Sequence, residues 1–369
     1  MEFMDCLDNI EDVRKDINKS YQLTDMIFLT MAAVLSGAKG WKGIKRFGEA
    51  KLDWLRQYRP FENGIPTRQS IGRIIRKISA QVLMDSFIIW INQQREESGI
   101  EHIAFDGKTL KGSGKNNHVN ALHLMSAMVV DSGITLYQQE CDEKSNEIGV
   151  MQSMLDVLEV EGSVLSADAM HCQKKTLSKT QEKGADIVLQ VKDNQKNLKE
   201  EIQAWFHKCR REGNIPVQEI SDIDGEHGRI VERSYRMLPA DNWLSELEKW
   251  PGIKSVIEVC RTHYHEGSET QKVSYHMSTL DDLSVISDVI RRHWQIESHH
   301  WILDTALKED DSHIYSEDGA KNMALLRRML LNIVKSHPLK DSVAGKFQRA
   351  AWDDDFRGEL LFGQKTCKV

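Results

Sequence analysis

The chain has 369 residues and a mass of 42.4 kDa, with 40% hydrophobic and 28% charged residues, which is typical of an ordinary soluble protein with two or three domains. Its six cysteines are scattered without a CxxC pair, which argues against a zinc knuckle or a disulfide framework and suits a reducing cytoplasm. The acidic N-terminus lacks the apolar core of a signal peptide, and the longest apolar run, Met26 to Gly37, is too short to span a bilayer. We therefore expect a cytoplasmic protein with no membrane partner.

Residues 1–98 predict a helical N-terminal domain. Apolar residues recur at helical spacing between Leu23 and Ala38, and Gly37 is a plausible C-cap. The formal charge of -7 argues mildly against a nucleic-acid partner, but residues 41–77 hold ten Lys/Arg against three Asp/Glu, interleaved with aromatic residues. This mixture suits phosphate contacts, although a solvated basic helix face explains it equally well.

One short segment of this domain predicts a basic helix. Thr67 follows Pro66 and is a good N-cap residue, and the isoleucines after it form one face. These isoleucines are Ile71, Ile74, Ile75 and Ile78. Arg68, Arg73 and Arg76 fall largely on the rest of the helix surface. Such a helix is a candidate to enter a groove of DNA, while core packing with a wet basic side is an equally simple explanation.

From residue 101 the pattern changes to strands. HIAFDGK, HLMSAMVV and TLYQQECD predict a three-stranded meander, after which helices and short apolar strands alternate up to Gly213. The order βββ-α-β-α-β-α predicts a ribonuclease H-like α/β core, a mixed sheet flanked by helices. In that topology the first and fourth strands are neighbours, which would bring Asp106 and Asp168 together.

The remaining chain predicts an insertion and a return to the core. Residues 214–280 contain three further strand-like segments and predict a β-rich insertion, so we expect the core to comprise residues 99–213 and 281–336, followed by a C-terminal tail at 337–369. A single long helix is expected from Leu283 to Asp310. Its spacing puts one set of residues on one face: His293, Glu297, His300 or Trp301, Asp304 and Lys308.

Three acidic residues lie in segments whose other residues are mainly apolar or aromatic. Asp106, Asp168 and Glu297 each lie within apolar or aromatic sequence. Burying an ionised carboxylate is costly unless it is paired or bound to a metal, and carboxylate oxygens are preferred ligands of hard divalent cations. We therefore predict a divalent-metal site built from these carboxylates.

The ordered succession of several motifs resembles one family over residues 8–335. DGKTLKGS, ADAMHCQ, VKDNQ, HGRIVERSY, WPGI and RRHWQIESHHWILD, together with GAKGWKGIKRFGE and GIPTRQS nearer the N-terminus, are similar to DDE insertion-sequence transposases of the H-repeat-associated (ISAs-type) branch. The resemblance implies that Asp106, Asp168 and Glu297 are catalytic and hold two Mg²⁺ ions, for which Mn²⁺ can substitute. Related transposases carry Tyr, Arg and Lys around the glutamate, where this chain has Ile290, His293 and Asp304.

The implied activity is metal-dependent cleavage of DNA at the ends of an insertion sequence and strand transfer into target DNA, that is, cut-and-paste transposition. The implied partners are double-stranded DNA, as terminal inverted repeats and target, and a second copy of the chain in a homodimer on DNA. A bacterial, nucleoid-associated location follows from the same resemblance. Two alternatives remain: a catalytically retired, transposase-derived DNA-binding or regulatory protein, and a simple metal-dependent nuclease.

Further residues are candidates for DNA contact because of their position near the three carboxylates. Beyond Arg68, Arg73 and Arg76, these are Lys108, Lys111, Lys192, Asn194, Gln195, Arg291, Arg292, His293 and Trp294. Each group also has an alternative role without DNA. The two lysines after Asp106 could simply be exposed to solvent, residues 192–195 could cap a helix, and Trp294 could pack in the core.

Other chemistries have weaker support. The chain contains no HExxH motif for a zinc hydrolase, and Cys172 lacks the partner pattern of a thiol nucleophile. The acidic runs Glu309–Asp311 and Asp353–Asp355 are most simply solvated turns.

Overall fold

The structure is a computed structural model of the chain. It describes residues 3–8, 10–12, 14–15, 19–95, 101–114, 120–141, 146–213, 217–226, 229–240, 245–265, 268–315 and 317–363. The chain divides into two compact units. The first comprises Met1–Ser98, Gly107–Lys144 and Glu297–Val369, and the second comprises Gly99–Asp106 and Ser145–Ile296. Strand β1 (His102–Thr109) contributes residues to both units.

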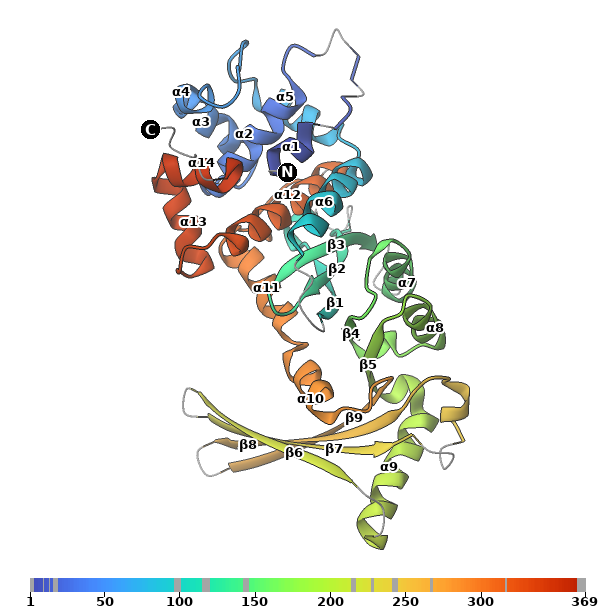
Figure 1. The fold of residues 1–369 in the computed structure, drawn as a ribbon. Helices are drawn as coiled ribbons and strands as arrows, with labels where there is room; N and C mark the ends of the chain where they lie inside the picture. The colour runs from blue at the N-terminus through green and yellow to red at the C-terminus, as the bar shows by residue number, and fades with distance from the viewer. Residues whose placement is uncertain are drawn as a thin grey trace. The chain divides into compact units, whose positions relative to one another are not determined.

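The first unit is mainly helical, and its helices come from both ends of the chain (Figure 1). Its N-terminal helices are α1 (Phe3–Asp8), α2 (Leu23–Leu35), α3 (Trp41–Ala50), α4 (Leu52–Leu55), α5 (Arg68–Arg76) and α6 (Ala80–Gln94). Its later elements are η2 (Lys111–Ser113), β2 (His123–Val129), β3 (Ile134–Cys141), α11 (Gln295–Thr305, from Glu297 onward), α12 (Glu317–Ser336), α13 (Val343–Trp352) and α14 (Asp354–Phe362). Strands β2 and β3 are antiparallel, in the order β3-β2-β1.

Helix α2 forms the centre of the N-terminal helices, as its apolar sequence predicts. Its side chains from Met26 to Leu35 are all buried. Gly37 follows with a φ of 87°, and the amide of Ala38 donates to the carbonyl of Ala33, so the glycine provides the left-handed residue that ends the helix. Phe28 of α2 stacks edge-on against Phe362 of α14, so the expected C-terminal tail contains helices that pack into this core.

The predicted basic helix is α5, and its cap and apolar face are confirmed. The Thr67 hydroxyl accepts a hydrogen bond from the amide of Ser70 at 3.2 Å, which satisfies one free donor of the first turn. The face that packs inward consists of Ile71, Ile74 and Ile75, followed by Ile78. Arg68, Arg73 and Arg76 are exposed.

The second unit contains the main part of the sheet. Its further elements are α7 (Glu147–Val157), β4 (Val164–Ala167), η4 (Ala169–His171), α8 (Lys174–Glu182), β5 (Asp186–Val191), η5 (Asp193–Gln195), α9 (Lys196–Glu212), β6 (Gln218–Glu226), β7 (Arg229–Pro239), η6 (Leu247–Lys249), β8 (Ser255–His265), β9 (Ser268–Ser278) and α10 (Leu283–Arg292). The strand order is β1-β4-β5-β9-β8-β7-β6. Strands β1, β4 and β5 are parallel and the others are antiparallel, so the predicted mixed ribonuclease H-like sheet is confirmed.

The inserted strands continue the core sheet, because β9 pairs with β5 through Val188↔Ser278 to Val191↔Tyr275. The sequence predicts three strands in this region and the structure contains a fourth, β6. Its sequence, QEISDIDGE, has only two apolar side chains, Ile220 and Ile223, so its composition gives little strand signal. Its pairing with β7 makes it a strand.

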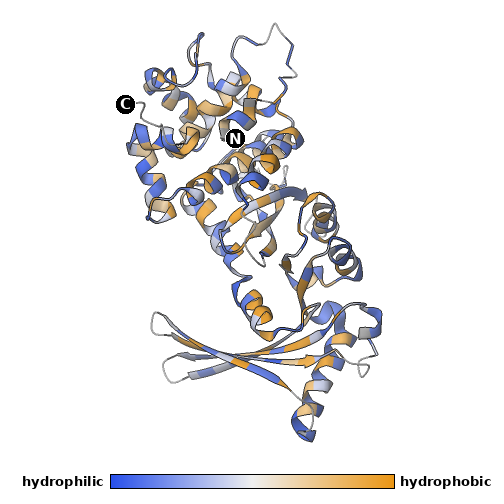
Figure 2. Cartoon of the chain, viewed as in Figure 1, coloured by the Kyte–Doolittle hydropathy of each residue, from blue (hydrophilic) through white to orange (hydrophobic). Residues whose placement is uncertain are grey.

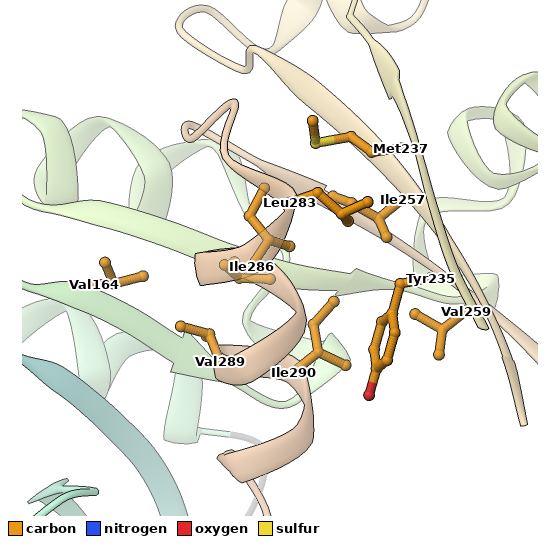
Figure 3. Close-up of a cluster of buried hydrophobic side chains, with 10 residues drawn as sticks. Val164, Tyr235, Met237, Ile257, Val259, Leu283, Ile286, Val289 and Ile290 are labelled. Carbon is orange, nitrogen blue, oxygen red and sulfur yellow. The ribbon is translucent and has the colours of Figure 1, made fainter. Parts of the chain in front are cut away.

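Helices cover both faces of these strands (Figure 1). On one face the Arg210 guanidinium of α9 pairs with Glu258 at 2.5 Å. The next residue, Val259, points to the other face and packs under α10. Figure 3 shows this core: Val289 and Ile290 of α10 lie with Val259 and Tyr235 of the strands. Figure 2 shows both hydrophobic and hydrophilic residues along β7 and β8, whose sequences are RIVERSYRMLP and SVIEVCRTHYH.

The expectation of one continuous helix from Leu283 to Asp310 is wrong. Helix α10 ends at Arg292 and α11 begins at Gln295, with a turn at His293 and Trp294. At the turn the amide of Ile296 donates to the carbonyl of His293, three residues back instead of four, which tightens the backbone and interrupts the helix. Lys308 lies beyond α11 with a φ of 52°, so the predicted common face does not extend through it.

Candidate metal and nucleic-acid site

Asp106 and Asp168 follow paired positions on neighbouring parallel strands. Phe105 of β1 pairs with Ala167 of β4, and each aspartate is the next residue in its chain. Parallel strands lie about 4.8 Å apart, and paired residues point to the same face. Asp106 shares its face with Ala104, and Asp168 shares its face with Ser166, the partner of Ala104. The second unit therefore brings the two carboxylates together on one face of the sheet, as the sequence predicts.

The carboxylate of Asp168 is held beside an imidazole. His293, at the end of α10, places Nε2 3.7 Å from Oδ1 of Asp168. Hydrogen bonding from His293 lowers the pKa of Asp168, burial opposes this shift, and the charges of His293 and Lys192 add to the lowering. Asp168 is therefore ionised at neutral pH, as a metal ligand has to be.

A chain of hydrogen bonds runs behind this carboxylate. His293 Nδ1 lies 2.9 Å from the Ser166 hydroxyl, which lies 2.7 Å from Nε2 of His102. His102 and Ser166 are buried in β1 and β4. The network joins the two strands that carry the aspartates to the end of α10, so it fixes the orientation of His293 and, through it, of Asp168.

The segment VKDNQ supports the turn after Asp168. Asn194 Nδ2 donates to the carbonyl of Ala169 at 2.8 Å, and Gln195 Nε2 donates to the carbonyl of Cys172 at 2.9 Å. These two side chains hold η4 in place. Lys192 is exposed, and its charge acts on Asp168. The contacts of Asn194 and Gln195 give them a role in shaping the site, and their predicted contact with DNA stays a prediction.

Glu297, the third predicted carboxylate, lies in the first turn of α11 and belongs to the first unit. Its side chain is exposed. The second unit by itself thus assembles two of the three carboxylates, and the part of Glu297 stays a prediction.

The residues before Glu297 differ in their surroundings. Arg291 makes ion pairs with Asp222 at 3.4 Å and Asp224 at 3.3 Å, and Arg292 pairs with Asp288. Both arginines therefore have acidic partners within the second unit. Trp294 is 42% exposed, which contradicts the alternative that it packs in a core.

Lys108 and Lys111 lie in the first unit and are not alike. Lys108 is buried, with its ammonium 2.8 Å from Asp304 and 3.3 Å from Asp310. Lys111 is exposed and lies 3.6 Å from Asp310. The alternative of solvent exposure is therefore correct for Lys111 and wrong for Lys108, whose charge is balanced by carboxylates. Glu309 nearby is also buried, and its 2.9 Å pair with Arg328 shows that the expectation of a solvated turn is wrong for this residue.

A basic cleft of about 1030 Å³ lies in the first unit, between the start of α3 and the exposed side of α5. Arg68, Arg73 and Arg76 line it, as do Lys39 and Lys42. Trp41 forms part of the wall and packs against Gly72, where a Cβ would approach the indole to 3.2 Å. The predicted basic face is thus a concave surface, a shape that the sequence pattern did not indicate.

The donor set of the second unit fits a hard divalent cation. Asp106 and Asp168 supply carboxylates directly after paired positions of β1 and β4, and burial raises the pKa of the Cys172 thiol to about 12, so a thiolate does not compete. No group of three or more His, Cys, Asp or Glu side chains forms a metal cluster within the described residues. Nor, in that part of the chain, is any helix long and apolar enough to cross a membrane.

The mixed sheet, the flanking helices and the two aspartates on adjacent parallel strands define a protein of the ribonuclease H-like transposase class. The chain belongs to the family of transposases with a DDE domain. Residues 97–333 match the family described as "Transposase DDE domain", and residues 4–91 match the family described as "DDE_Tnp_1-associated".

Relatives of nearly the same length support this assignment. The chain is 32% identical over 370 residues to the H repeat-associated putative transposase YhhI of Escherichia coli (strain K12), covering 98% of this chain and 97% of the relative. It is 31% identical over 374 residues to the putative transposase YncI of Escherichia coli O157:H7, covering 97% and 94%. A shorter relative, the inactive transposase YbfQ of Escherichia coli (strain K12), is 47% identical over 64 residues, which are 17% of this chain and 76% of that protein.

Proposed function

We propose that this chain is an active transposase that cleaves DNA at the ends of an insertion sequence and joins those ends to target DNA. The observation that carries the proposal is the placement of Asp106 and Asp168 at matching positions of two adjacent parallel strands. Two carboxylates on one face of a sheet, one of them with a lowered pKa, are suited to bind divalent cations. The basic cleft on α3 and α5 adds a surface suited to DNA phosphates.

The roles of the chain's own residues follow from their positions. Asp106 and Asp168 would hold Mg²⁺ or Mn²⁺, with Glu297 as the third carboxylate of the site. Two such ions, when bound, supply a water activated for attack on phosphorus and charge stabilisation for the leaving oxygen. The network of His102, Ser166 and His293 keeps Asp168 oriented toward the site, and Asn194 and Gln195 hold the turn that follows it.

DNA would be held in part outside this site. The exposed arginines Arg68, Arg73 and Arg76 would contact phosphates of the terminal inverted repeats, and a homodimer would hold two DNA ends for joining to target DNA. Lys111, Lys192, Arg291, Arg292 and Trp294 are additional proposed contacts with DNA. For Lys108, the ion pairs with Asp304 and Asp310 compete with a phosphate contact.

The test is cleavage of end-labelled duplex DNA carrying the terminal repeats, in Mg²⁺ and in Mn²⁺, by the wild type and by Asp106→Ala, Asp168→Ala and Glu297→Ala. We expect nicking and strand transfer by the wild type and none by the three variants. A wild type that binds these ends but cuts them in neither metal would instead identify a DNA-binding protein that has lost its activity. Cleavage without joined products would indicate a simple nuclease.

DNA binding can be tested separately. Changing Arg73 and Arg76 to Ala should weaken binding and reduce the slope of log affinity against log salt by about 1.8, since each phosphate contact contributes about 0.9. The matched control is the double substitution of Lys196 and Arg211 on α9, which removes the same charge from exposed positions. Equal slopes for both double variants would remove the α5 arginines from the DNA interface.

A further inference from the structure

A second cleft, of about 270 Å³, opens beside Asp168 in the second unit. Its wall includes Asp168, His293 and Trp294 on one side and residues of β8 and β9 on the other. The volume is close to the lower end of the roughly 300–1,000 Å³ typical of small-ligand pockets, so it suits a group the size of one nucleotide and not a duplex.

Two cations of the inserted strands face each other in this cleft. Arg261 of β8 pairs in register with Lys272 of β9, and Arg261 also pairs with Arg233 of β7. Like charges directly opposite each other destabilise a sheet. Arg233 is balanced by Asp222 at 3.1 Å and Asp224 at 3.7 Å.

Arg261 and Lys272 have no such balance. Among the residues that the structure describes, neither makes an ion pair with an acidic side chain. Arg261 lies two residues after Val259, which packs under α10, so it points to the same face of the sheet as that core. Both cations therefore line the same cleft as Asp168.

The buried side chain of His276 also lines this cleft. It is only 7% exposed and lines the cleft, and its Nδ1 has no hydrogen-bond partner within the described part of the chain. Burial, followed by the positive charges of His293, Lys192 and Arg261, lowers its pKa to about 3, so the ring is neutral at physiological pH. A buried polar atom without a partner is costly, and a ligand in the cleft would satisfy it.

We propose that this cleft binds a phosphodiester of a single DNA strand, with Arg261 and Lys272 on the phosphate oxygens and His276 hydrogen-bonded to the same nucleotide. The inference rests on the proposed function, because it places the strand next to the carboxylate that is proposed to act on it. It assigns to the inserted strands the task of holding one strand of the DNA at the site. None of the three residues carries a signal of this role in the sequence, since they meet only through the strand register.

The test measures the reactivity of Lys272 in the full-length protein. An amine-reactive ester is applied in EDTA, with and without a four-nucleotide single-stranded DNA at constant ionic strength, and labelling is read by mass spectrometry. Lys196 on α9, which is exposed, is the internal control. We expect the oligonucleotide to protect Lys272 and not Lys196. Unchanged labelling of Lys272 at saturating oligonucleotide would overturn the proposal.

The variant Arg261→Gln sharpens the test. It removes one charge-assisted contact, so half-protection of Lys272 should need about tenfold more oligonucleotide. Arg211→Gln, on the exposed surface of α9, should leave the protection curve unchanged. Identical curves for Arg261→Gln and the wild type would also overturn the proposal, because the pair would not be acting together on one phosphate.

The protection of Lys272 and the cleavage of DNA can be contradicted independently of each other. Protection of Lys272 in a protein that never cleaves DNA would support the strand site and contradict the catalytic activity. Cleavage by a protein whose Lys272 is never protected would contradict the strand site alone.

Discussion

Each unit of the chain buries a group of charged side chains, and the two groups differ in how completely they are closed. In the first unit, Glu309 and Arg328 are both fully buried and 2.9 Å apart, with Lys108 3.8 Å from the same carboxylate. In the second unit, the Asp168 side chain is 45% exposed beside a His293 that is only 11% exposed. The Glu309 carboxylate is thus enclosed together with two cations of its own chain.

The Asp168 carboxylate contacts His293 on one side and remains partly exposed to solvent. His293, which is hydrogen-bonded to Ser166, lies beside Asp168, and Asp168 lines a cleft that Arg261 and Lys272 also line. A closed ion pair stabilises one arrangement of the chain, whereas a half-exposed ionised carboxylate can accept a ligand. The comparison predicts that substitutions in the first group change mainly stability and substitutions in the second change mainly activity.

The largest expected effect is on the stability of the first group. Glu309→Gln should lower the free energy of unfolding by about 3–5 kcal/mol, because it leaves Arg328 buried without its counter-ion. Urea denaturation followed by circular dichroism measures this change. The double substitution Glu309→Leu with Arg328→Met removes both charges and should recover most of the loss. A stability loss as large in the double variant as in Glu309→Gln would show that packing, and not charge pairing, dominates there.

The acid stability of the second unit should depend on His276. Its folded-state pKa of about 3 lies below the ordinary value of 6.5, so the unfolded chain binds the proton first as the pH falls. Stability should therefore decrease below about pH 6.5, by up to about 1.4 kcal/mol per pH unit. His276→Gln should flatten this dependence, and His207→Gln, at an exposed position, should not. Burial also lowers the pKa of His299 in the first unit, so a part of the acid sensitivity should persist.

The smallest effect on stability is expected at Ser166. Ser166→Ala removes the hydroxyl between His102 and His293, which should cost about 1–3 kcal/mol. Because His293 then loses the contact that orients it toward Asp168, the rate of DNA nicking should fall by more than the loss of folded protein explains. Ser178→Ala, at an exposed position of α8, is the control. If Ser166→Ala nicks DNA at the wild-type rate, the network does not position the site.

The sequence predicts the core topology and the pairing of Asp106 with Asp168 because both rest on local patterns. An aspartate that directly follows apolar strand positions is visible in the sequence, and the alternation of strands and helices predicts which strands are neighbours. The N-cap at Thr67 is predicted for the same reason, since its hydrogen bond joins residues only three positions apart, Thr67 and Ser70.

The parts that the sequence did not predict depend on distant partners. Ser166 and His293 are 127 positions apart, and neither residue type signals the other. The acidic sequence around Glu309 is typical of a solvated turn, but Glu309 is buried in an ion pair with Arg328 of α12. The break between α10 and α11 has no proline or glycine to mark it, and the row of cations on β7, β8 and β9 exists only through the strand register.

Nicking of DNA by Asp168→Cys in Mg²⁺ and in Mn²⁺ tests whether Asp168 is a metal ligand of a DNA-cleaving site. A thiolate is a poor ligand for Mg²⁺ and a better one for Mn²⁺. We predict no nicking by Asp168→Cys in Mg²⁺ and partial recovery in Mn²⁺, with no recovery for Asp168→Ala and wild-type behaviour for the exposed control Asp281→Asn. Wild-type nicking by Asp168→Cys or Asp168→Ala in Mg²⁺ would contradict the assignment.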